Sequence, residues 1–293
     1  MKKVICVICC FLCFALLSCG TAEKKKPRKK VGPVNSEESA DDEEGENGIT
    51  ENGIHNLPNG DRYIGGFKDH KKYGEGEYIY ANGDRYKGFF ENGRYNGQGE
   101  LKLKDGTKYI GEFKDGLRHG QGTLVFPSGA KYEGSFVNDM MDGEGVFRFA
   151  DEKEYRGTFS KNVRHGHGVM VFPSGAEYDG DFNHDKRSGK GRMTYRNGSV
   201  YEGDFVDGQR DGRGKLTKAN GDVYEGDFEG DTMTGIGKYT AKNGAVIYGV
   251  WKNGKLEKRL PLSGSKEELE AENEDDAEDV DSPEEETSGN TEE

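Results

Sequence analysis

Tyr201-Glu202-Gly203-Asp204-Phe205 contains the pattern on which most of the chain is built. Eight regular copies are followed by a ninth, less regular copy, which begins at Ile247 and has Gly249 and Trp251 in the glycine and aromatic positions. Self-similarity at a fixed period of this size is typical of repeat proteins, in which each unit stacks on its neighbours. The regular copies of Tyr-x-Gly-x-Phe recur every 23 residues and start at Tyr63, Tyr86, Tyr109, Tyr132, Tyr155, Tyr178, Tyr201 and Tyr224.

Each unit carries two further fixed features. A Gly-x-Gly pair follows the first pattern, as in Gly120/Gly122 and Gly212/Gly214. A turn dipeptide precedes the next tyrosine, and such dipeptides supply the positive φ that tight hairpin turns require. One unit therefore predicts a strand, a short turn, a second strand and another turn. The dipeptides are Asn82-Gly83, Asp105-Gly106, Ser128-Gly129, Ser174-Gly175, Asn197-Gly198, Asn220-Gly221 and Asn243-Gly244.

The spacing within a unit favours strands over helices. Residues two apart share a face of a strand, so Tyr201, Gly203 and Phe205 point the same way, with a glycine between two rings. The frequent glycines would each cost a helix about 1 kcal/mol. In a sheet they instead leave room for an aromatic ring or a neighbouring backbone.

These features closely resemble the MORN repeat, a 23-residue unit with Tyr-x-Gly-x-Phe/Trp, then Gly-x-Gly, then Asp/Asn-Gly. The resemblance covers residues 61 to about 255. It implies an all-β fold in which stacked β-hairpins form an elongated, single-layer antiparallel sheet, here assigned to residues 53–260. The fifth unit has Asp151-Glu152 where a turn glycine is expected, which predicts a looser hairpin.

The two ends of the array differ from its middle. Residues 53–58 are expected to form half a repeat that pairs with the strand at Tyr63 and covers the first edge of the sheet. At the other end, Trp251 and the stretch Lys255-Leu256-Glu257-Lys258 are expected to act as a terminal cap.

Residues 1–18 are predicted to be a signal peptide, because Lys2 and Lys3 precede an apolar run from Val4 to Leu17. This run ends in Leu16-Leu17-Ser18-Cys19, which resembles the lipobox of bacterial lipoproteins. The resemblance implies that Cys19 is lipidated and anchors the mature chain to a membrane. An ordinary secretory leader with a coincidental cysteine is the alternative. All five cysteines lie at or before Cys19, so the mature fold is expected to contain no disulfide.

Charged segments flank the predicted array. Residues 19–52 contain a basic cluster from Lys24 to Lys30 and an acidic stretch from Glu37 to Glu46, and are predicted to be a flexible tether. The basic cluster is either solvated or in contact with anionic headgroups. Residues 261–293 hold 15 acidic residues and one lysine, which predicts a disordered acidic tail. The repeats themselves are nearly neutral, which gives no case for nucleic-acid binding.

The tyrosine ladder allows two interpretations. It either lines a groove that binds an extended peptide, or packs on adjacent repeats and forms the core. The candidate groove residues are Tyr86, Tyr109, Tyr132, Tyr155, Tyr178, Tyr201 and Tyr224.

Catalytic chemistry is not evident in the sequence. His119, His165 and His167 occupy a variable turn position and are interpreted as exposed residues, with a zinc site as the alternative. The Gly-x-Gly pairs are not followed by helices, so they are not a dinucleotide fingerprint. We therefore predict that the chain is no enzyme and needs no cofactor or metal.

Two functional classes remain open. The first is a cell-envelope lipoprotein whose repeat sheet is a non-enzymatic scaffold for a protein partner, as the resemblance to MORN arrays implies. The second is a repeat protein that binds phospholipid or cell-wall glycan. Gly20 follows Cys19, and in a host with two membranes the resemblance to bacterial lipoproteins then implies the outer membrane.

Overall fold

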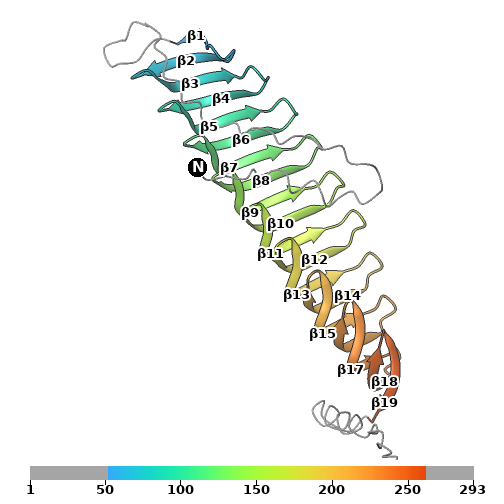
Figure 1. Ribbon diagram of the computed structural model, residues 1–293. Coiled ribbons are helices and arrows are strands. Elements are labelled where there is room, and N and C mark those ends of the chain that lie inside the picture. The colour runs from blue at the N-terminus through green and yellow to red at the C-terminus, as the bar shows by residue number, and fades with distance from the viewer. Residues whose placement is uncertain (1–51, 262–293) are drawn as a thin grey trace, which may run out of the picture.

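The computed structural model describes residues 52–261, which form one open antiparallel sheet of 19 strands (Figure 1). Every strand pairs with the strands directly before and after it in the sequence, so the chain meanders from one end of the sheet to the other. At about 4.8 Å between strands, the sheet is on the order of 85 Å long. The predicted all-β, single-layer fold of stacked hairpins is confirmed.

Strands of seven and nine residues alternate from β2 to β17. The bounds are β1 Gly53–Asn56, β2 Arg62–Lys68, β3 Lys71–Ile79, β4 Arg85–Glu91, β5 Arg94–Lys102, β6 Lys108–Lys114, β7 Leu117–Val125, β8 Lys131–Val137, β9 Met140–Arg148, β10 Glu154–Ser160, β11 Val163–Val171, β12 Glu177–Asn183, β13 Lys186–Thr194, β14 Val200–Val206, β15 Gln209–Thr217, β16 Val223–Glu229, β17 Thr232–Thr240, β18 Val246–Lys252 and β19 Lys255–Leu260.

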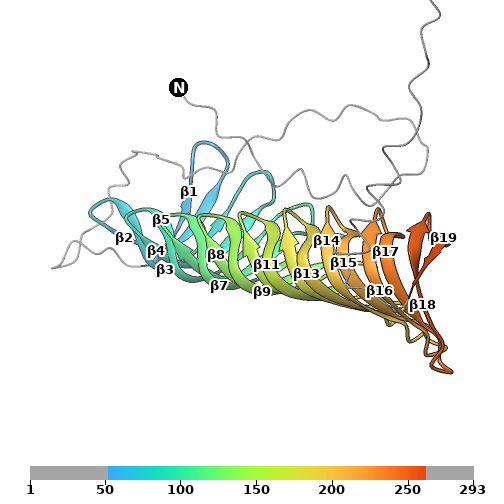
Figure 2. The ribbon, with the colours of Figure 1, turned by 90° about the horizontal axis from the view of Figure 1, so that it is seen from below.

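The turns follow the dipeptides seen in the sequence. Between β15 and β16, Gly221 adopts a φ of 91° and its N–H donates to the Lys218 carbonyl at 2.9 Å. The turn inside a unit also reaches its neighbour, because the Gly208 N–H donates to the carbonyl of Arg187, one unit earlier, at 2.9 Å. Turns of successive units therefore stack along both sides of the sheet, whose strands are arched (Figure 2).

A row of glycines crosses the sheet near the middle of its strands. Gly203 of β14 pairs with Gly191 of β13 and with Gly214 of β15. A Cβ at Gly203 would lie 2.5 Å from the Tyr201 hydroxyl oxygen, so the absence of a side chain makes room for the ring. The same pairing continues through Gly53, Gly65, Gly76, Gly88, Gly99, Gly111, Gly122, Gly134, Gly145, Gly157, Gly168, Gly180, Gly191, Gly203, Gly214, Gly226, Gly237 and Gly249.

The core is an alternating ladder of tyrosine and phenylalanine rings. Tyr201 meets Phe205 of its own unit edge-to-face at 5.2 Å and Phe228 of the next unit at 5.0 Å. Such pairs contribute about 0.5–1.5 kcal/mol each beyond the burial of their surface. Because each unit packs only on its neighbours, stability accumulates along the array rather than in one globular core.

The strands at both ends of the array pair with their neighbours as the sequence predicts. β1 pairs with β2 along Gly53–Asn56, as expected for half a repeat. The ninth unit forms the hairpin of β18 and β19, where Trp251 packs on Tyr224 at 5.3 Å and its indole N–H donates to the Gly237 carbonyl.

The turn before the fifth tyrosine, Tyr155, forms in the same way as the others, despite its missing glycine. Glu152 adopts a φ of 67° and donates to the Phe149 carbonyl at 3.1 Å, while the Phe149 N–H donates to the Lys153 carbonyl at 2.8 Å. The expectation of a looser hairpin is therefore wrong, because the hydrogen bonds of the turn are kept. Instead, the backbone of Glu152 adopts a positive φ that is unfavourable for a residue other than glycine.

The predicted signal peptide, Cys19, the tether before Asn52 and nearly all of the acidic tail lie outside the described residues. Within residues 52–261, no helix is long and apolar enough to cross a membrane.

Candidate interaction surfaces of the sheet

The face that carries the tyrosines is called the inner face here, and the opposite face is called the outer face. The seven candidate groove tyrosines, together with Tyr63, are only 0–1 % exposed. They do not form an exposed aromatic groove, so that interpretation is wrong for these rings. The alternative that they form the core is confirmed for Tyr86, Tyr109, Tyr132, Tyr155, Tyr178, Tyr201 and Tyr224.

The hydroxyl groups of these tyrosines are used internally. The Tyr201 hydroxyl donates to the Asp204 carbonyl at 3.0 Å, and the Tyr86 hydroxyl donates to the Phe89 carbonyl at 2.9 Å. The pairing of β14 with β15 shifts register between Gly203 and Phe205, which leaves Asp204 without a ladder partner on that side. The tyrosine hydroxyl therefore donates a hydrogen bond to the Asp204 carbonyl, which lacks a partner in the strand ladder at the register shift.

Burial also sets the ionisation of the ladder. Desolvation raises the pKa of each of the eight core tyrosines well above the usual value of 10.0, and raises the pKa of Tyr155 to about 12. All of these hydroxyls remain neutral hydrogen-bond donors near neutral pH.

A second aromatic row lies on the inner face, above the core, and was missed by the sequence reasoning. Phe149 packs on Phe147 with ring centroids 4.5 Å apart, and Tyr80 packs on Tyr78 at 4.6 Å. Phe149 and Tyr80 each start a turn between two units, three positions before the position of the turn glycine. Residues at this place therefore recur with the same 23-residue period as the rest of the pattern. We call this half-buried set the turn aromatics: Tyr80, Phe126, Phe149, Phe172 and Tyr195.

The second residue of the second strand in each unit is a long side chain, and two of these side chains contact turn aromatics: Arg164 lies over Phe149, and the Tyr95 hydroxyl bonds to that of Tyr80. Arg164 lies over three rings, with its guanidinium carbon 5.8 Å from the Phe149 centroid, 5.7 Å from Tyr155 and 5.4 Å from Phe182. We call this set the covering row: Lys72, Tyr95, Arg118, Met141, Arg164, Arg187, Arg210 and Met233.

The arginines of the covering row are held rigidly. Arg164 donates from Nε to Asp185 Oδ1 at 2.9 Å and from Nη2 to the Asp185 carbonyl at 2.8 Å. Arg118 makes the same two bonds to Asp139 at 3.1 and 2.8 Å. Two hydrogen bonds to one aspartate hold each of these guanidinium groups over the neighbouring rings.

Lys72 is the buried lysine of the covering row, at 7 % exposure. Its Nζ lies 5.0 Å from the Tyr78 ring centroid and 5.7 Å from that of Tyr63. Desolvation lowers the pKa of Lys72, and the nearby Asp61 carboxylate offsets part of this change. The inner face thus combines aromatic rings with fixed cations, and its covering row changes from lysine and tyrosine in the first two units to arginine or methionine in the others.

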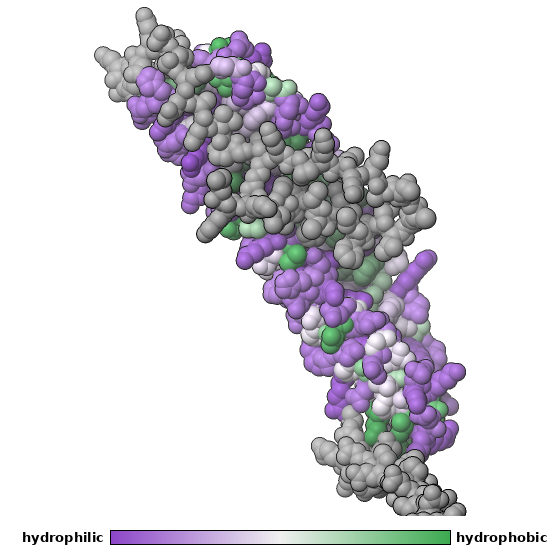
Figure 3. Space-filling view, in the orientation of Figure 1, coloured by the Kyte–Doolittle hydropathy of each residue, from purple (hydrophilic) through white to green (hydrophobic). Residues whose placement is uncertain are grey.

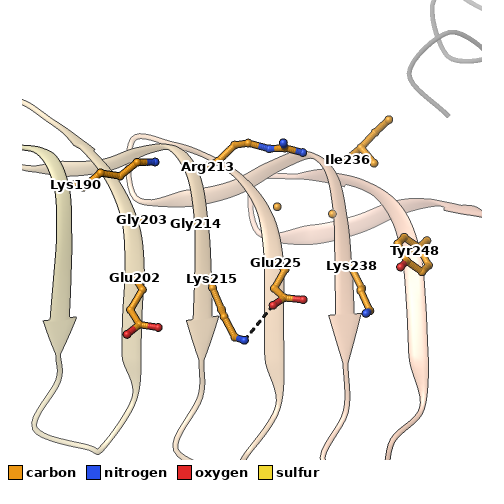
Figure 4. Close-up of a pocket in the computed structure, with 12 residues that line it drawn as sticks. Lys190, Glu202, Gly203, Arg213, Gly214, Lys215, Glu225, Ile236, Lys238 and Tyr248 are labelled. Carbon is orange, nitrogen blue, oxygen red and sulfur yellow. Dashed lines mark ion pairs between the residues drawn. The ribbon is translucent and has the colours of Figure 1, made fainter. Parts of the chain in front are cut away.

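The outer face carries a shallow groove of about 620 Å³ near β13–β18 (Figure 4). Glycines 203, 214, 226 and 237 form its floor, and charged side chains stand on both sides. The charges pair within the groove, as in Lys215 with Glu225 at 3.1 Å. Four cations and two carboxylates line the groove, and two of these cations pair with aspartates beside it, Lys190 with Asp204 and Arg213 with Asp227.

The three histidines are not brought together. His119 lies on β7, whereas His165 and His167 lie on β11. His167 Nε2 is 3.1 Å from Asp179 Oδ1, and His165 meets the ring of His184 at 5.8 Å. Among residues 52–261, no group of three or more histidine, cysteine, aspartate or glutamate side chains is arranged to hold a metal ion.

Solved structures that are similar to this chain include two TCP domains. The TCP10 domain of Danio rerio CPAP, solved with a peptide of STIL, is 15% identical over 71% of this chain and 98% of its own, with a TM-score of 0.40. The Drosophila melanogaster SAS-4 TCP domain, solved with a proline-rich motif of Ana2, is 12% identical over 69% of this chain and 90% of its own, with a TM-score of 0.31. No curated protein matches the chain.

The model of the MORN repeat matches eight consecutive units, at residues 63–85, 86–108, 109–131, 132–153, 155–177, 178–200, 201–223 and 224–246. The ninth hairpin, β18–β19, continues the same stacking beyond the matched units. These matches cover more than half of the chain, and their tyrosines and glycines form the core described above. The chain therefore belongs to the MORN repeat family.

Proposed function

We propose that this protein is a non-enzymatic scaffold that binds a protein partner along the inner face of its sheet. The observation that carries the proposal is the second layer of that face. There the half-buried turn aromatics stand beside the covering row, as Phe149 stands beside Arg164. Aromatic residues, arginine and methionine are the side chains that most often dominate the energy of protein interfaces.

The rigidity of this layer favours binding. The guanidinium groups of Arg118 and Arg164 are already fixed by Asp139 and Asp185, so a partner need not immobilise them. Side chains that are ordered before binding lose less entropy when the complex forms. The edges of the neighbouring rings offer apolar contact without any rearrangement of the core.

The spacing of the layer fits an extended partner. Equivalent side chains of successive units are two strands apart, or about 9.6 Å. Three residues of an extended polyproline II segment rise about 9.3 Å and bring the side chain back to the same face, whereas two helical turns of seven residues span about 10.5 Å. An extended segment therefore stays in step with more repeats than a helix. We infer that the partner presents an apolar residue at every third position.

The proposal also includes a membrane anchor. It rests on the Leu16-Leu17-Ser18-Cys19 sequence after an apolar run, which would place a lipid on Cys19 and the array in the cell envelope. In a host with two membranes, Gly20 after Cys19 favours the outer membrane. Metabolic labelling with palmitate should mark the wild-type chain and not a Cys19→Ala variant; equal labelling of both would contradict the anchor.

Site-specific photocrosslinking in cells tests the scaffold. A photoreactive phenylalanine replaces Phe149 or Phe172 on the inner face, and replaces Val206, which is 54 % exposed on the outer face, as the matched control. We expect discrete protein adducts from the inner positions and not from Val206. Adducts with phospholipid or cell-wall glycan alone, from the same inner positions, would replace the scaffold with the surface-binding alternative.

A further inference from the structure

We propose that the acidic segment Glu37–Glu46, which precedes the array, docks on a row of cations on the outer face of the first four units. The outer-facing end residues of β2 to β9 form one continuous cross-strand row, with six positive charges and no negative one. We call it the basic row: Arg62, Ile79, Arg85, Lys102, Lys108, Val125, Lys131 and Arg148.

The basic row ends sharply. The next two strands place Glu154 and Val171 at the same position, and Glu177 follows. From β13 onward the position holds only threonine and valine, as in Thr194 paired with Val200. The positive charge is therefore confined to one half of the sheet, although the repeat geometry is the same throughout.

Glutamates of the adjacent outer row contact the basic row and are shared between its cations. Glu100 lies 2.5 Å from Lys102 and 3.2 Å from Lys108, so one carboxylate serves two ammonium groups. Glu133 is shared in the same way by the next pair, at 2.7 Å from Lys131 and 2.5 Å from Arg148. Each glutamate therefore neutralises only half of the charge that it contacts.

The count of charges over these strands leaves an excess of cations. The carboxylates that contact the basic row or stand beside it are Glu77, Glu100, Glu133 and Glu154. The adjacent outer row adds one further cation, Lys87. Over these two rows, seven cations against four glutamates leave a surplus of three positive charges, which an acidic segment can neutralise. The next outer row holds Glu75, Glu112 and Glu144, so the surplus is confined to the end of the strands where the basic row lies.

The basic row is accessible to an incoming segment. The side chains of Arg85 and Arg148 are 53% and 45% exposed, and those of Lys108 and Lys131 are 37% and 38% exposed. Six of the eight residues of the basic row are charged, so this surface is hydrophilic, and the part of the array visible in Figure 3 is predominantly hydrophilic as well. A polar, charged segment suits this surface better than an apolar one.

The segment Glu37–Glu46 has the matching charge. It contains seven acidic residues and no basic residue within ten positions. Extended, these ten residues span about 33–36 Å. The basic row crosses seven strand spacings from β2 to β9, or about 34 Å. The two lengths agree, so the carboxylates can follow the cations along the whole row.

The connection to the array makes this segment the favoured occupant. Only six residues lie between Glu46 and Gly53, where β1 begins beside β2. This short connection reaches about 24 Å at most, so the segment is held at high local concentration next to the basic row. The acidic tail begins beyond β19, about 48 Å from the end of the row at β9, and must bridge ten strands first.

Docking would fix the orientation of the array relative to the part of the chain before Glu37. With residues 37–46 bound along β2–β9, the stretch before Glu37 leaves from the outer face, and the inner face points away from it. The inference does not depend on the scaffold function, because it concerns the opposite face of the sheet.

Zero-length carbodiimide crosslinking of the full chain, read by mass spectrometry, tests the docking. We expect intramolecular amide links from residues 37–46 to Lys102, Lys108 and Lys131, and we expect them to disappear at 1 M salt, where charge interactions are screened. The triple variant Arg62→Gln, Arg85→Gln, Arg148→Gln keeps these reporter lysines and should lower their crosslink yield about fivefold. The matched control Arg156→Gln, Arg192→Gln, Arg213→Gln alters the other half of the outer face and should leave it unchanged.

Lysine acetylation gives an independent readout that leaves the array untouched. Replacing the seven acidic residues of 37–46 by glutamine or asparagine should raise the acetylation rates of Lys102 and Lys108 about threefold, with Lys190 and Lys215 unaffected. Three results would each overturn the proposal. The first is that residues 37–46 crosslink only to Lys24–Lys30, and the second is that the basic row crosslinks only to the acidic tail. The third is that the acetylation rates do not change. Occupation of the row by phosphatidylglycerol vesicles with equal affinity in the wild-type and segment-neutral chains would also overturn it.

Discussion

The hydroxyl group of Tyr201 lies directly above Gly203, where a Cβ would be 2.5 Å from its oxygen and 2.5 Å from the Cα of Gly214. The first contact involves a fully buried ring and the second involves backbone, so neither neighbour can move away cheaply. Gly203 has an ordinary backbone conformation, and the requirement for glycine there is purely one of space. The tyrosine and the glycine row therefore specify each other.

Gly203→Ala should consequently destabilise the array by about 1–3 kcal/mol through overpacking. The matched control is Gly198→Asn, because Gly198 has a φ of 83° and a Cβ added there would meet no atom within 4 Å. Asparagine tolerates that conformation, so the control should cost less than about 1 kcal/mol. Urea unfolding followed by circular dichroism measures both, and equal losses would contradict the spatial explanation.

Tyr201→Phe should destabilise the array by about 1–2 kcal/mol, because it removes the hydroxyl that donates to the Asp204 carbonyl and leaves that carbonyl without this bond. Tyr248→Phe, on the outer face beside the shallow groove, is the matched control and should change the free energy of unfolding by less than about 0.5 kcal/mol. Thermal unfolding of the two variants checks this. A loss as large for Tyr248→Phe would argue against the role of the hydroxyl.

Nearly the whole fold could be predicted from the repeat period. Tyr-x-Gly-x-Phe, Gly-x-Gly and the turn dipeptides recur in register, so the strands, the turns and the half-repeat at Gly53 followed from the pattern. Each of these features depends on local backbone conformation and on contacts between adjacent units. A local pattern repeated many times therefore carries most of the information in a quasi-linear array.

The candidate site was harder to predict for a physical reason. The pattern shows that Tyr201 and Phe205 share a face, but it does not show the register shift between Gly203 and Phe205 or the second layer of side chains over the rings. That layer contains Phe149 and Arg164, whose period is visible in the sequence but whose contact is not. Charge rows such as Lys102 with Lys108 emerge only once the register of every strand is known.

Glu152 marks the one regular turn between units that lacks its glycine. Glu152→Gly should stabilise the array by about 1 kcal/mol, because its φ of 67° is costly for glutamate and natural for glycine. The reciprocal change Gly175→Glu, at the same position one unit later, should destabilise by a similar amount, since Gly175 has a φ of 82°. Chemical unfolding of the two variants should shift in opposite directions, and a common direction would contradict this account.

The buried tyrosine ladder predicts cooperative unfolding in alkali. Burial holds the pKa of all eight core tyrosines above the value of 10.0 that they regain in the unfolded chain. Their stabilising contribution is complete below pH 10 and is lost as the pH rises from there toward the folded-state pKa. Each tyrosine then removes about 1.4 kcal/mol of stability per pH unit.

Unfolded tyrosines are only half ionised at pH 10, so eight such groups together remove about 8 kcal/mol between pH 10 and pH 11, which is comparable to the whole stability of an ordinary domain. Lys72 has the opposite sign, because its lowered pKa means that its deprotonation relieves a cost of burial, but it is a single group. We expect circular dichroism to lose its sheet signal in the same narrow pH range in which tyrosinate absorbance rises. Tyrosinate absorbance rising to completion while the sheet signal persists would contradict the burial of these hydroxyls.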